Sequence, residues 1–178
     1  MAGVLRHFGG SRNPDPWSDP TPLCAPAFAG VTERERGAEG ELMAQPNPTG
    51  VIGIGVDLIE IDRVRDVLTR HPGRFPARCF TEAEAAYCRR GAHPEERFAA
   101  RFAAKEAVMK ALGTGWNHGV NFRDIEVTRQ PSGAPGIRLA GAALEVANRL
   151  GVERIALSLS HGRDQAIAFV IFSGTVPA

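Results

Sequence analysis

The sequence has few cysteines and no long hydrophobic run. Its three cysteines, Cys24, Cys79 and Cys88, have neither CxxC nor zinc-ligand spacing, which fits a reducing compartment better than a disulfide framework. No stretch of about 18 apolar residues occurs, and the N-terminus has no apolar core of the signal-peptide kind. These absences predict a cytoplasmic protein that does not cross a membrane.

An excess of charge of one sign is also missing. The chain has 21 Lys and Arg against 20 Asp and Glu, a formal net charge of +1, which gives no reason to expect nucleic acid as the main partner. Several common motifs are absent as well: the GxxxxGK[ST] P-loop, a complete GxGxxG after a strand, HExxH and GxSxG. The common nucleotide-binding, protease and hydrolase classes therefore lose their support.

The first 49 residues differ from the rest of the chain. They hold seven of the 13 prolines and show no hydrophobic period. Such a segment cannot offset the entropy lost on ordering, so we predict a disordered leader over residues 1–49 and one domain over residues 50–178. Met43 begins a natural short lead into the first strand, which predicts that translation starts there. An intact mass that includes residues 1–42 would contradict this start.

Hydrophobic spacing and turn signals predict the elements of that domain. The run VIGIGVD predicts a strand that ends near Asp57. Helices are expected over about 60–71, 82–90, 94–112 and 142–150, with a capping box from Thr81 to Glu84 and a stop at Gly113. Further strands are expected over 124–129, 137–139, 154–160 and 165–172, the last two joined by a hairpin-like turn. The mixture indicates an α+β fold, an antiparallel sheet with helices packed to one side.

Two carboxylates stand out against apolar surroundings. Asp57 interrupts an apolar strand, where an ionised carboxylate buried without a partner costs several kcal/mol; a surface cap is the alternative. In FAARFAAKEAVMKALG, Phe102, Glu106 and Lys110 stack on one largely apolar side of a helix. The alternative for Glu106 is an intrahelical ion pair with Lys110 worth ~0.2–0.5 kcal/mol.

Two semi-buried carboxylates on facing elements suit Mg²⁺, which completes its shell with water and substrate phosphate. We therefore expect Asp57 and Glu106 to form a divalent-metal site that handles phosphate groups in a group-transfer enzyme. Lys105 and Lys110 are expected to act there as point charges on phosphate oxygens. A second stripe of positive charge, usually a solvated surface, runs beside Glu106: Arg97, Arg101 and Lys105.

Two weaker signals follow. The turn Gly113-Thr114-Gly115 has backbone amides that could approach a phosphate, although such a turn is more often only a helix stop. His161 ends the apolar run IALSLS before Gly162, at a strand end where functional groups often project. A lone histidine is more often structural.

Several segments together resemble the holo-acyl-carrier-protein synthase family, from about residue 51 to 173: VIGIGVDLIEIDRV, RCFTEAEAAYC, ERFAARFAAKEAVMKALGTG, NFRDIEV and LSLSHGRDQAIAFVI. GVD in a first strand and FAAKEAVMK in a long helix resemble the paired signature of 4'-phosphopantetheinyl transferases. The resemblance implies that family's fold. It also implies transfer of 4'-phosphopantetheine from coenzyme A to a serine of apo-acyl carrier protein, with release of adenosine 3',5'-bisphosphate, in fatty acid biosynthesis.

The resemblance also implies site residues and assembly. It assigns Asp57 and Glu106 to Mg²⁺, although Mn²⁺ stays open, and Arg63 and Arg70 to the acidic carrier protein, where a solvated helix face is the alternative. The implied catalytic residues are Glu106, Lys110 and His161. The implied coenzyme A contacts are Arg101, Lys105, Lys110, Gly113, Gly115 and His161. We expect the serine proton to be taken by Glu106 or by a metal-bound water, and the sequence does not decide between them. Short family members are homotrimers with active sites at subunit interfaces, which we expect here.

Two other functions remain open. A Mg²⁺-dependent nucleotide hydrolase with the same carboxylates would turn over coenzyme A without an acceptor protein. A non-catalytic module that binds a carrier protein through Arg63 and Arg70 would tolerate Asp57→Ala.

Overall fold

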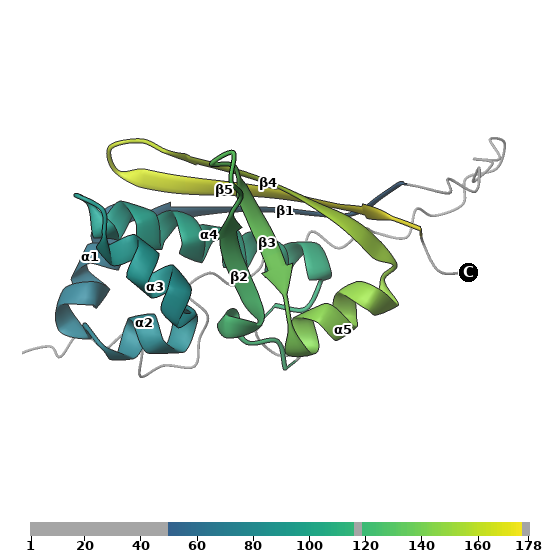
Figure 1. Ribbon diagram of the computed structural model, residues 1–178, viewed down its shortest axis with the longest axis horizontal. Helices are drawn as coiled ribbons and strands as arrows, with labels where there is room; N and C mark the ends of the chain where they lie inside the picture. The colour runs from purple at the N-terminus through teal and green to yellow at the C-terminus, as the bar shows by residue number, and fades with distance from the viewer. Residues whose placement is uncertain (1–49, 116–118, 176–178) are drawn as a thin grey trace, which may run out of the picture. The chain divides into compact units, whose positions relative to one another are not determined.

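The computed structural model describes residues 50–115 and 119–175, and these belong to one compact unit of the chain (Figure 1). The predicted leader and the predicted start at Met43 lie outside the described residues. A three-stranded antiparallel sheet has the order β1-β5-β4, formed by Gly50–Glu60, Gln165–Gly174 and Val152–His161. Ile125–Arg129 (β2) and Pro135–Leu139 (β3) pair as a separate antiparallel sheet. The predicted α+β class is confirmed, with two sheets in place of one.

Four predicted helices are present: α1 (Ile61–Arg70), α3 (Glu82–Arg89), α4 (Pro94–Leu112) and α5 (Gly141–Arg149). The capping box at Thr81 and Glu84 has both of its hydrogen bonds, and Gly113 ends α4 in the left-handed region at φ 70°. Two short elements were not predicted, α2 (Arg74–Cys79) and the 3-10 helix η1 (Phe122–Asp124). α2 holds a proline in its first turn, where the missing N–H costs nothing.

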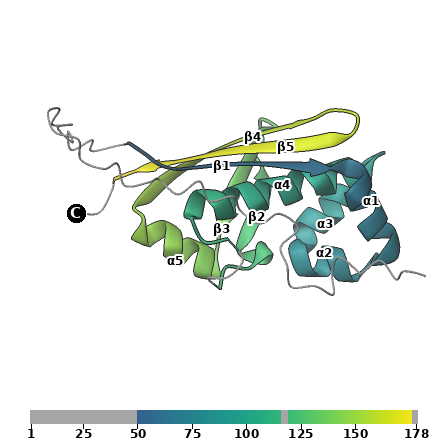
Figure 2. The same cartoon turned by 180° about the vertical axis from the view of Figure 1, so that it is seen from behind.

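Helix α4 lies directly against β1 because β1 has glycine where the two elements meet. A Cβ on Gly55 would lie 1.8 Å from the carbonyl oxygen of Ala107, and one on Gly53 would lie 2.3 Å from that of Ala111. Strand and helix run in opposite directions, since Gly53 lies over residue 111 and Gly55 over residue 107. Figures 1 and 2 show α4 beneath the sheet.

From Phe98 to Leu112, every residue of α4 except Lys110 is buried. The helix therefore has no solvent face over this stretch, and the positive stripe predicted at its surface lies largely inside the protein. Aromatic contacts fasten α4 to α2 and η1: Phe102 lies 5.7 Å from Phe75 and 5.0 Å from Phe122, between ring centroids. Phe80, at the end of α2, lies 5.0 Å from Phe98.

The other face of the three-stranded sheet carries exposed apolar side chains. In Figures 1 and 2 the described helices all lie on the α4 side of this sheet. We call the residues of the opposite face the outer sheet face: Val51, Ile54, Val56, Leu58, Ile167 and Phe169, each at least 38% exposed. Among the described residues, no helix is long and apolar enough to cross a membrane.

Candidate active site

Asp57 lies within β1 and faces α4, with 4% of its surface exposed. Its Oδ1 accepts a hydrogen bond of 2.8 Å from Lys110 Nζ, which also donates to the Val56 carbonyl at 3.1 Å. Its Oδ2 is buried and has no hydrogen-bond partner within the protein. Burial raises the pKa of this carboxyl, although the hydrogen bond and charge of Lys110 oppose the rise. The alternative of a surface cap is excluded, because the N-cap of α1 is Glu60.

Glu106 is 6% exposed and lies on α4, one turn before Lys110. Residues four apart share a helix face, and Lys110 reaches Asp57 from that face. Because β1 and α4 run in opposite directions, each step forward along β1 corresponds to an earlier position on α4. Asp57, two residues after Gly55, therefore lies toward the turn of α4 that precedes Ala107. Both carboxylates are therefore more deeply buried than the sequence predicted, and they lie on two elements in direct contact.

The donor set fits a hard divalent cation. Mg²⁺ takes one or two carboxylates from the protein and oxygens from water and substrate phosphate. Asp57 offers a buried oxygen without a hydrogen bond, and Glu106 offers a second buried carboxylate. Among residues 50–115 and 119–175, His, Cys, Asp and Glu side chains nowhere gather in groups of three or more that could hold a metal. Two protein carboxylates plus ligand oxygens is thus the arrangement that these residues can provide.

Lys105 requires a correction. It was predicted to meet phosphate oxygens, but it is fully buried and its ammonium donates to Glu84 at 2.8 Å and to the carbonyls of Phe122, at 2.9 Å, and Ile125. Burial lowers the pKa of Lys105, and the charge of Glu84 opposes this effect. All three N–H groups of an ammonium are used by these acceptors. Lys105 therefore has no N–H donor left for a substrate, and its charge is buried beside Glu84.

Arg101 is buried to 7% exposure, and its guanidinium lies 4.1 Å above the ring of Tyr87. Arg97 approaches the same ring at 4.9 Å and donates to the Tyr87 carbonyl at 3.2 Å. Arg101 Nε is buried without a hydrogen-bond partner. A guanidinium held on an aromatic ring is pre-oriented, and the predicted role of Arg101 toward coenzyme A stays a prediction.

The glycine turn after α4 caps the helix, which was the alternative to a phosphate contact. The amide of Gly113 donates to the carbonyl of Lys110 at 3.1 Å, and that of Thr114 to Met109 at 3.2 Å. These amides close the helix in a C-cap, so Gly113 does not offer the phosphate-binding amide that was predicted. Gly115 has φ 53°, and its predicted contact with coenzyme A stays a prediction.

His161 is the last residue of β4 and is exposed. It pairs with Ala166 of β5, and Ala166 pairs with Ile59 of β1. The predicted strand ended at residue 160, and β4 extends one residue further to include His161. Because β5 lies between β4 and β1, two strand spacings, roughly 10 Å, separate the backbone of His161 from that of β1. Within a single chain, His161 therefore does not lie next to Asp57, because β5 separates their strands.

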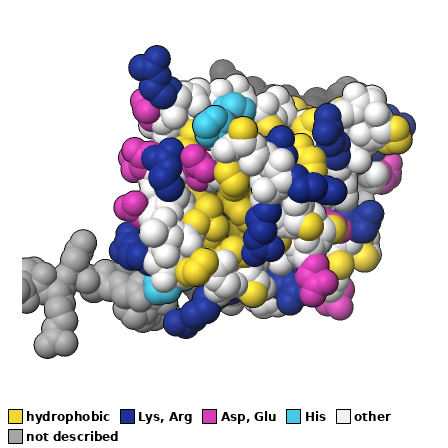
Figure 3. Space-filling view, turned by 60° about the vertical axis from the view of Figure 1, so that its left-hand side comes forward, with side chains coloured by type: hydrophobic (Ala, Val, Ile, Leu, Met, Phe, Trp, Pro, Cys, Tyr) yellow, Lys and Arg dark blue, Asp and Glu magenta, His cyan; other side chains and the backbone are white. Residues whose placement is uncertain are grey.

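The arginines expected to meet a carrier protein lie on α1, and both Arg63 and Arg70 are exposed. Arg70 pairs with Asp66 of its own helix at 3.6 Å. Arg65, which was not predicted, pairs with Asp62 and reaches Glu95 of α4 at 3.4 Å. Figure 3, in which the α1 side comes forward, shows Lys and Arg side chains spread over this face, with acidic and hydrophobic side chains among them.

Two residues near the site were missed by the sequence. Glu84 was predicted only as the N3 residue of a capping box, yet it is 2% exposed and binds Lys105. Tyr87, the ring beneath Arg97 and Arg101, was given no role. A signal for Glu84 existed, because Ala85 and Cys88, which are also buried, lie one and four residues after it and so share its side of the short helix. Its partner on α4 lies 21 residues away, which local spacing cannot reveal.

Comparison with known proteins gives one consistent result. The sequence pattern of the 4'-phosphopantetheinyl transferase superfamily matches residues 53–170. The holo-[acyl-carrier-protein] synthase of Solibacter usitatus is 48% identical over 121 residues, which cover 68% of this chain and 97% of that protein. The crystal structure of the synthase of Neisseria meningitidis has a TM-score of 0.63 at 33% identity, covering 69% of this chain and 98% of that one. The Helicobacter pylori synthase in complex with coenzyme A has a TM-score of 0.60 at 30% identity, covering 67% and 98%.

Proposed function

The chain belongs to the 4'-phosphopantetheinyl transferase superfamily, and from this premise we propose how its two buried carboxylates act. It is a holo-acyl-carrier-protein synthase: it transfers 4'-phosphopantetheine from coenzyme A to a serine of apo-acyl carrier protein. The serine oxygen forms a bond to the phosphorus that carries the pantetheine group. The P–O bond of the pyrophosphate breaks, and adenosine 3',5'-bisphosphate leaves.

The proposal rests on one observation, the buried carboxylate pair with a hydrogen-bond-free oxygen on Asp57. We assign Asp57 and Glu106 to Mg²⁺, which when bound would supply positive charge to the coenzyme A pyrophosphate. Burial supports this role, because an electrostatic interaction is stronger where water is excluded. The raised pKa of Asp57 results from burial, which the hydrogen bond and charge of Lys110 only partly offset.

Lys110 acts on the leaving phosphate. Its side chain is 28% exposed and its Nζ already lies 2.8 Å from Asp57, so it can reach a ligand bound beside that carboxylate. An ammonium there stabilises the charge that develops on adenosine 3',5'-bisphosphate, and it can donate its proton to that group. Glu106, or a water that it orients, takes the proton from the serine hydroxyl. Arg101 and His161 are assigned to the phosphates of coenzyme A.

We propose a homotrimer with active sites at its subunit interfaces, in the cytoplasm. The outer sheet face supports it, since a sheet that exposes several large apolar side chains marks an interaction site. The position of His161, about two strands from β1, fits a site that a second copy completes. Arg63 and Arg70 on α1 are assigned to acidic acyl carrier protein, so binding weakens as salt is added.

The test is a transfer reaction. Full-length protein is incubated with coenzyme A, Mg²⁺ and apo-acyl carrier protein, and the carrier is weighed by mass spectrometry. We expect a mass gain of one phosphopantetheine, which EDTA prevents and Mg²⁺ restores. Glu106→Gln keeps the side-chain shape but removes the anion, so it lowers the transfer rate at least ~100-fold if the metal supplies the charge stabilisation. Transfer that persists in EDTA at the full rate would refute the metal assignment.

The same assay separates the other functions. A hydrolase would release adenosine 3',5'-bisphosphate without any carrier protein. Arg63→Ala tests docking, because it raises the KM for carrier protein and leaves the KM for coenzyme A unchanged; Arg129→Ala, at the exposed end of β2, is its charge-matched control. Equal effects of the two substitutions on carrier affinity would argue against a docking role of α1.

A further inference from the structure

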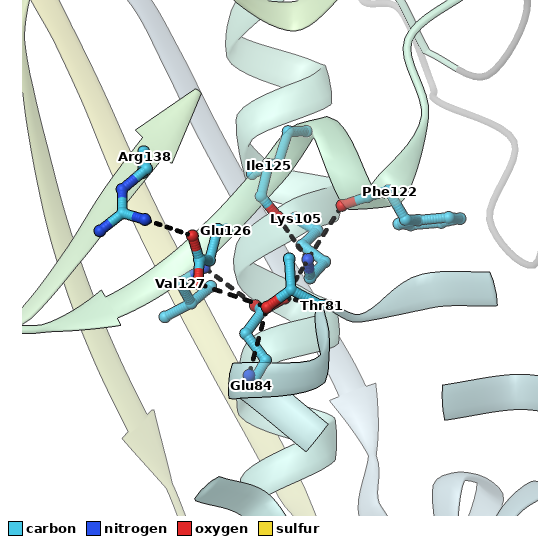
Figure 4. A network of polar contacts seen from close by, with 8 residues as sticks. All are labelled: Thr81, Glu84, Lys105, Phe122, Ile125, Glu126, Val127 and Arg138. Carbon is cyan, nitrogen blue, oxygen red and sulfur yellow. Dashed lines mark hydrogen bonds and ion pairs between the residues drawn. The ribbon is translucent and has the colours of Figure 1, made fainter. Parts of the chain in front are cut away.

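The buried charge of Lys105 joins four elements at one point. Its ammonium, on α4, donates to Glu84 of α3, to the carbonyl of Phe122 in η1 and to that of Ile125 at the start of β2. Figure 4 shows these acceptors converging on the Lys105 nitrogen. Every donor of the ammonium is therefore used, and each acceptor comes from a different element.

Glu84 completes the network with both carboxylate oxygens. Oε2 accepts from Lys105 at 2.8 Å and from the Thr81 amide at 2.9 Å, and Oε1 accepts from the Val127 amide at 2.9 Å. The side chains of Lys105 and Glu84 are 0% and 1% exposed, so the pair is shielded from water. The five hydrogen bonds fix α4 against α3 and β2 in direction as well as in distance.

Stability alone does not explain such a pair. Removing two charges from water costs about as much as their attraction returns, so what the pair adds is the pairing of four backbone groups in fixed directions. Beside the phenylalanines that pack on α2 and η1, six buried residues of α4 are alanines: Ala99, Ala100, Ala103, Ala104, Ala107 and Ala111. Small side chains allow close approach, but they do not fix where a helix stops along its axis. Directed hydrogen bonds do fix it.

We propose that Lys105 and Glu84 are positioning residues that set the axial position and rotation of α4, and through it the place of the Glu106 carboxylate opposite Asp57. Glu106 is the next residue after Lys105, about 100° further around the helix, so a shift of one moves the other. This inference rests on the proposed function, in which both carboxylates hold the metal. Lys105 itself touches no substrate.

The experiment uses the paired apolar variant Lys105→Met/Glu84→Leu in the full chain. Thermal unfolding reports stability, and calorimetric titration of coenzyme A at a series of Mg²⁺ concentrations reports the metal site. We expect the variant to fold with a lower melting temperature, because the buried backbone partners of Lys105 and Glu84 lose their hydrogen bonds. We also expect it to need roughly tenfold or more Mg²⁺ for half-maximal coenzyme A binding, as for other supporting residues of metal sites. In the transfer assay kcat falls while the KM for carrier protein is unchanged. Arg138→Met, in the exposed outer part of the same network, leaves all these quantities unchanged.

A folded paired variant with wild-type Mg²⁺ dependence and kcat would overturn the inference. If that variant does not fold, Glu84→Gln is measured in the same way, because it keeps the side-chain shape and removes one charge. An unchanged Mg²⁺ dependence of folded Glu84→Gln would also overturn the inference. A failure of the proposed function would look different. In that case the wild-type protein itself would show no Mg²⁺ dependence, or Glu106→Gln would leave transfer intact.

Discussion

At the scale of single residues, Asp57 carries a conflict between stability and function. Burial raises its pKa in the folded protein above the value in the unfolded chain. The stability that this protonated carboxyl contributes is fully present below its unfolded pKa, and it is lost as the pH rises through the folded pKa. At neutral pH the carboxylate is therefore a cost to folding, only partly offset by Lys110.

Asp57→Asn consequently separates the two properties. We expect it to abolish transfer, because the neutral amide cannot hold a divalent cation as a carboxylate does. We also expect it to melt no lower than wild type at pH 7, because the buried charge is gone and Lys110, 28% exposed, can reach water. Activity assays and thermal unfolding across pH check this. A stability loss at pH 7 that disappears in acid, where Asp57 is protonated, would show that the ion pair with Lys110 outweighs the cost of burial.

The burial of Asp57 and Glu106 could be predicted because each is a charge placed among apolar neighbours in the sequence, a signal that is local. The prediction failed for Lys105 because the same helical spacing describes a solvated stripe and a buried one. The partners that decide between them, Glu84 and the carbonyls of Phe122 and Ile125, come from elements distant in the sequence. The amide of Gly113 was assigned to a phosphate for a related reason, since one glycine suits both a helix cap and an anion-binding turn.

At the scale of elements, the contact of β1 with α4 depends on Gly55. A Cβ there would lie 1.8 Å from a backbone oxygen of α4, so Gly55→Ala must push the strand and helix apart. We expect a loss of about 1–3 kcal/mol in the free energy of unfolding, as for other overpacked cores, measured by urea denaturation. Gly73→Ala is the control: nothing lies within 4 Å of its Cβ, and we expect a change below about 1 kcal/mol. Equal effects would contradict the close approach.

Most elements were predictable because their ends carry chemical signals, such as the capping box of Thr81 and the left-handed cap at Gly113. α2 was not, because six residues are too few to show a helical period and its proline suggests a loop. The glycines of β1 were visible in the sequence, but the helix that requires them lies more than 50 residues away along the chain. Local patterns therefore predicted the elements, and long-range packing determined how they meet.

At the scale of the whole molecule, the outer sheet face is the surface that we assign to the proposed trimer. Phe169 and Val56, directly paired in neighbouring strands, are 40% and 49% exposed. We expect Phe169→Lys to dissociate the proposed trimer, because burying an unpaired ammonium in an apolar contact is costly, and to reduce transfer along with it. Analytical ultracentrifugation measures the mass. Leu144→Lys, on α5 and 43% exposed, is the control, and a trimer that survives Phe169→Lys would exclude this face from the interface.

The complete enclosure of α4 has a consequence for motion. Backbone amides exchange their hydrogens with water when the structure around them opens, and the most enclosed elements open last. Every residue of α4 from Phe98 to Leu112 except Lys110 is buried, so amide exchange in this helix follows the unfolding of the whole domain rather than local fraying. Among the described elements, the helix that carries Glu106 is thus the one whose backbone we expect to open most slowly. We therefore expect any movement that admits coenzyme A or releases product to involve the elements around α4 rather than α4 itself.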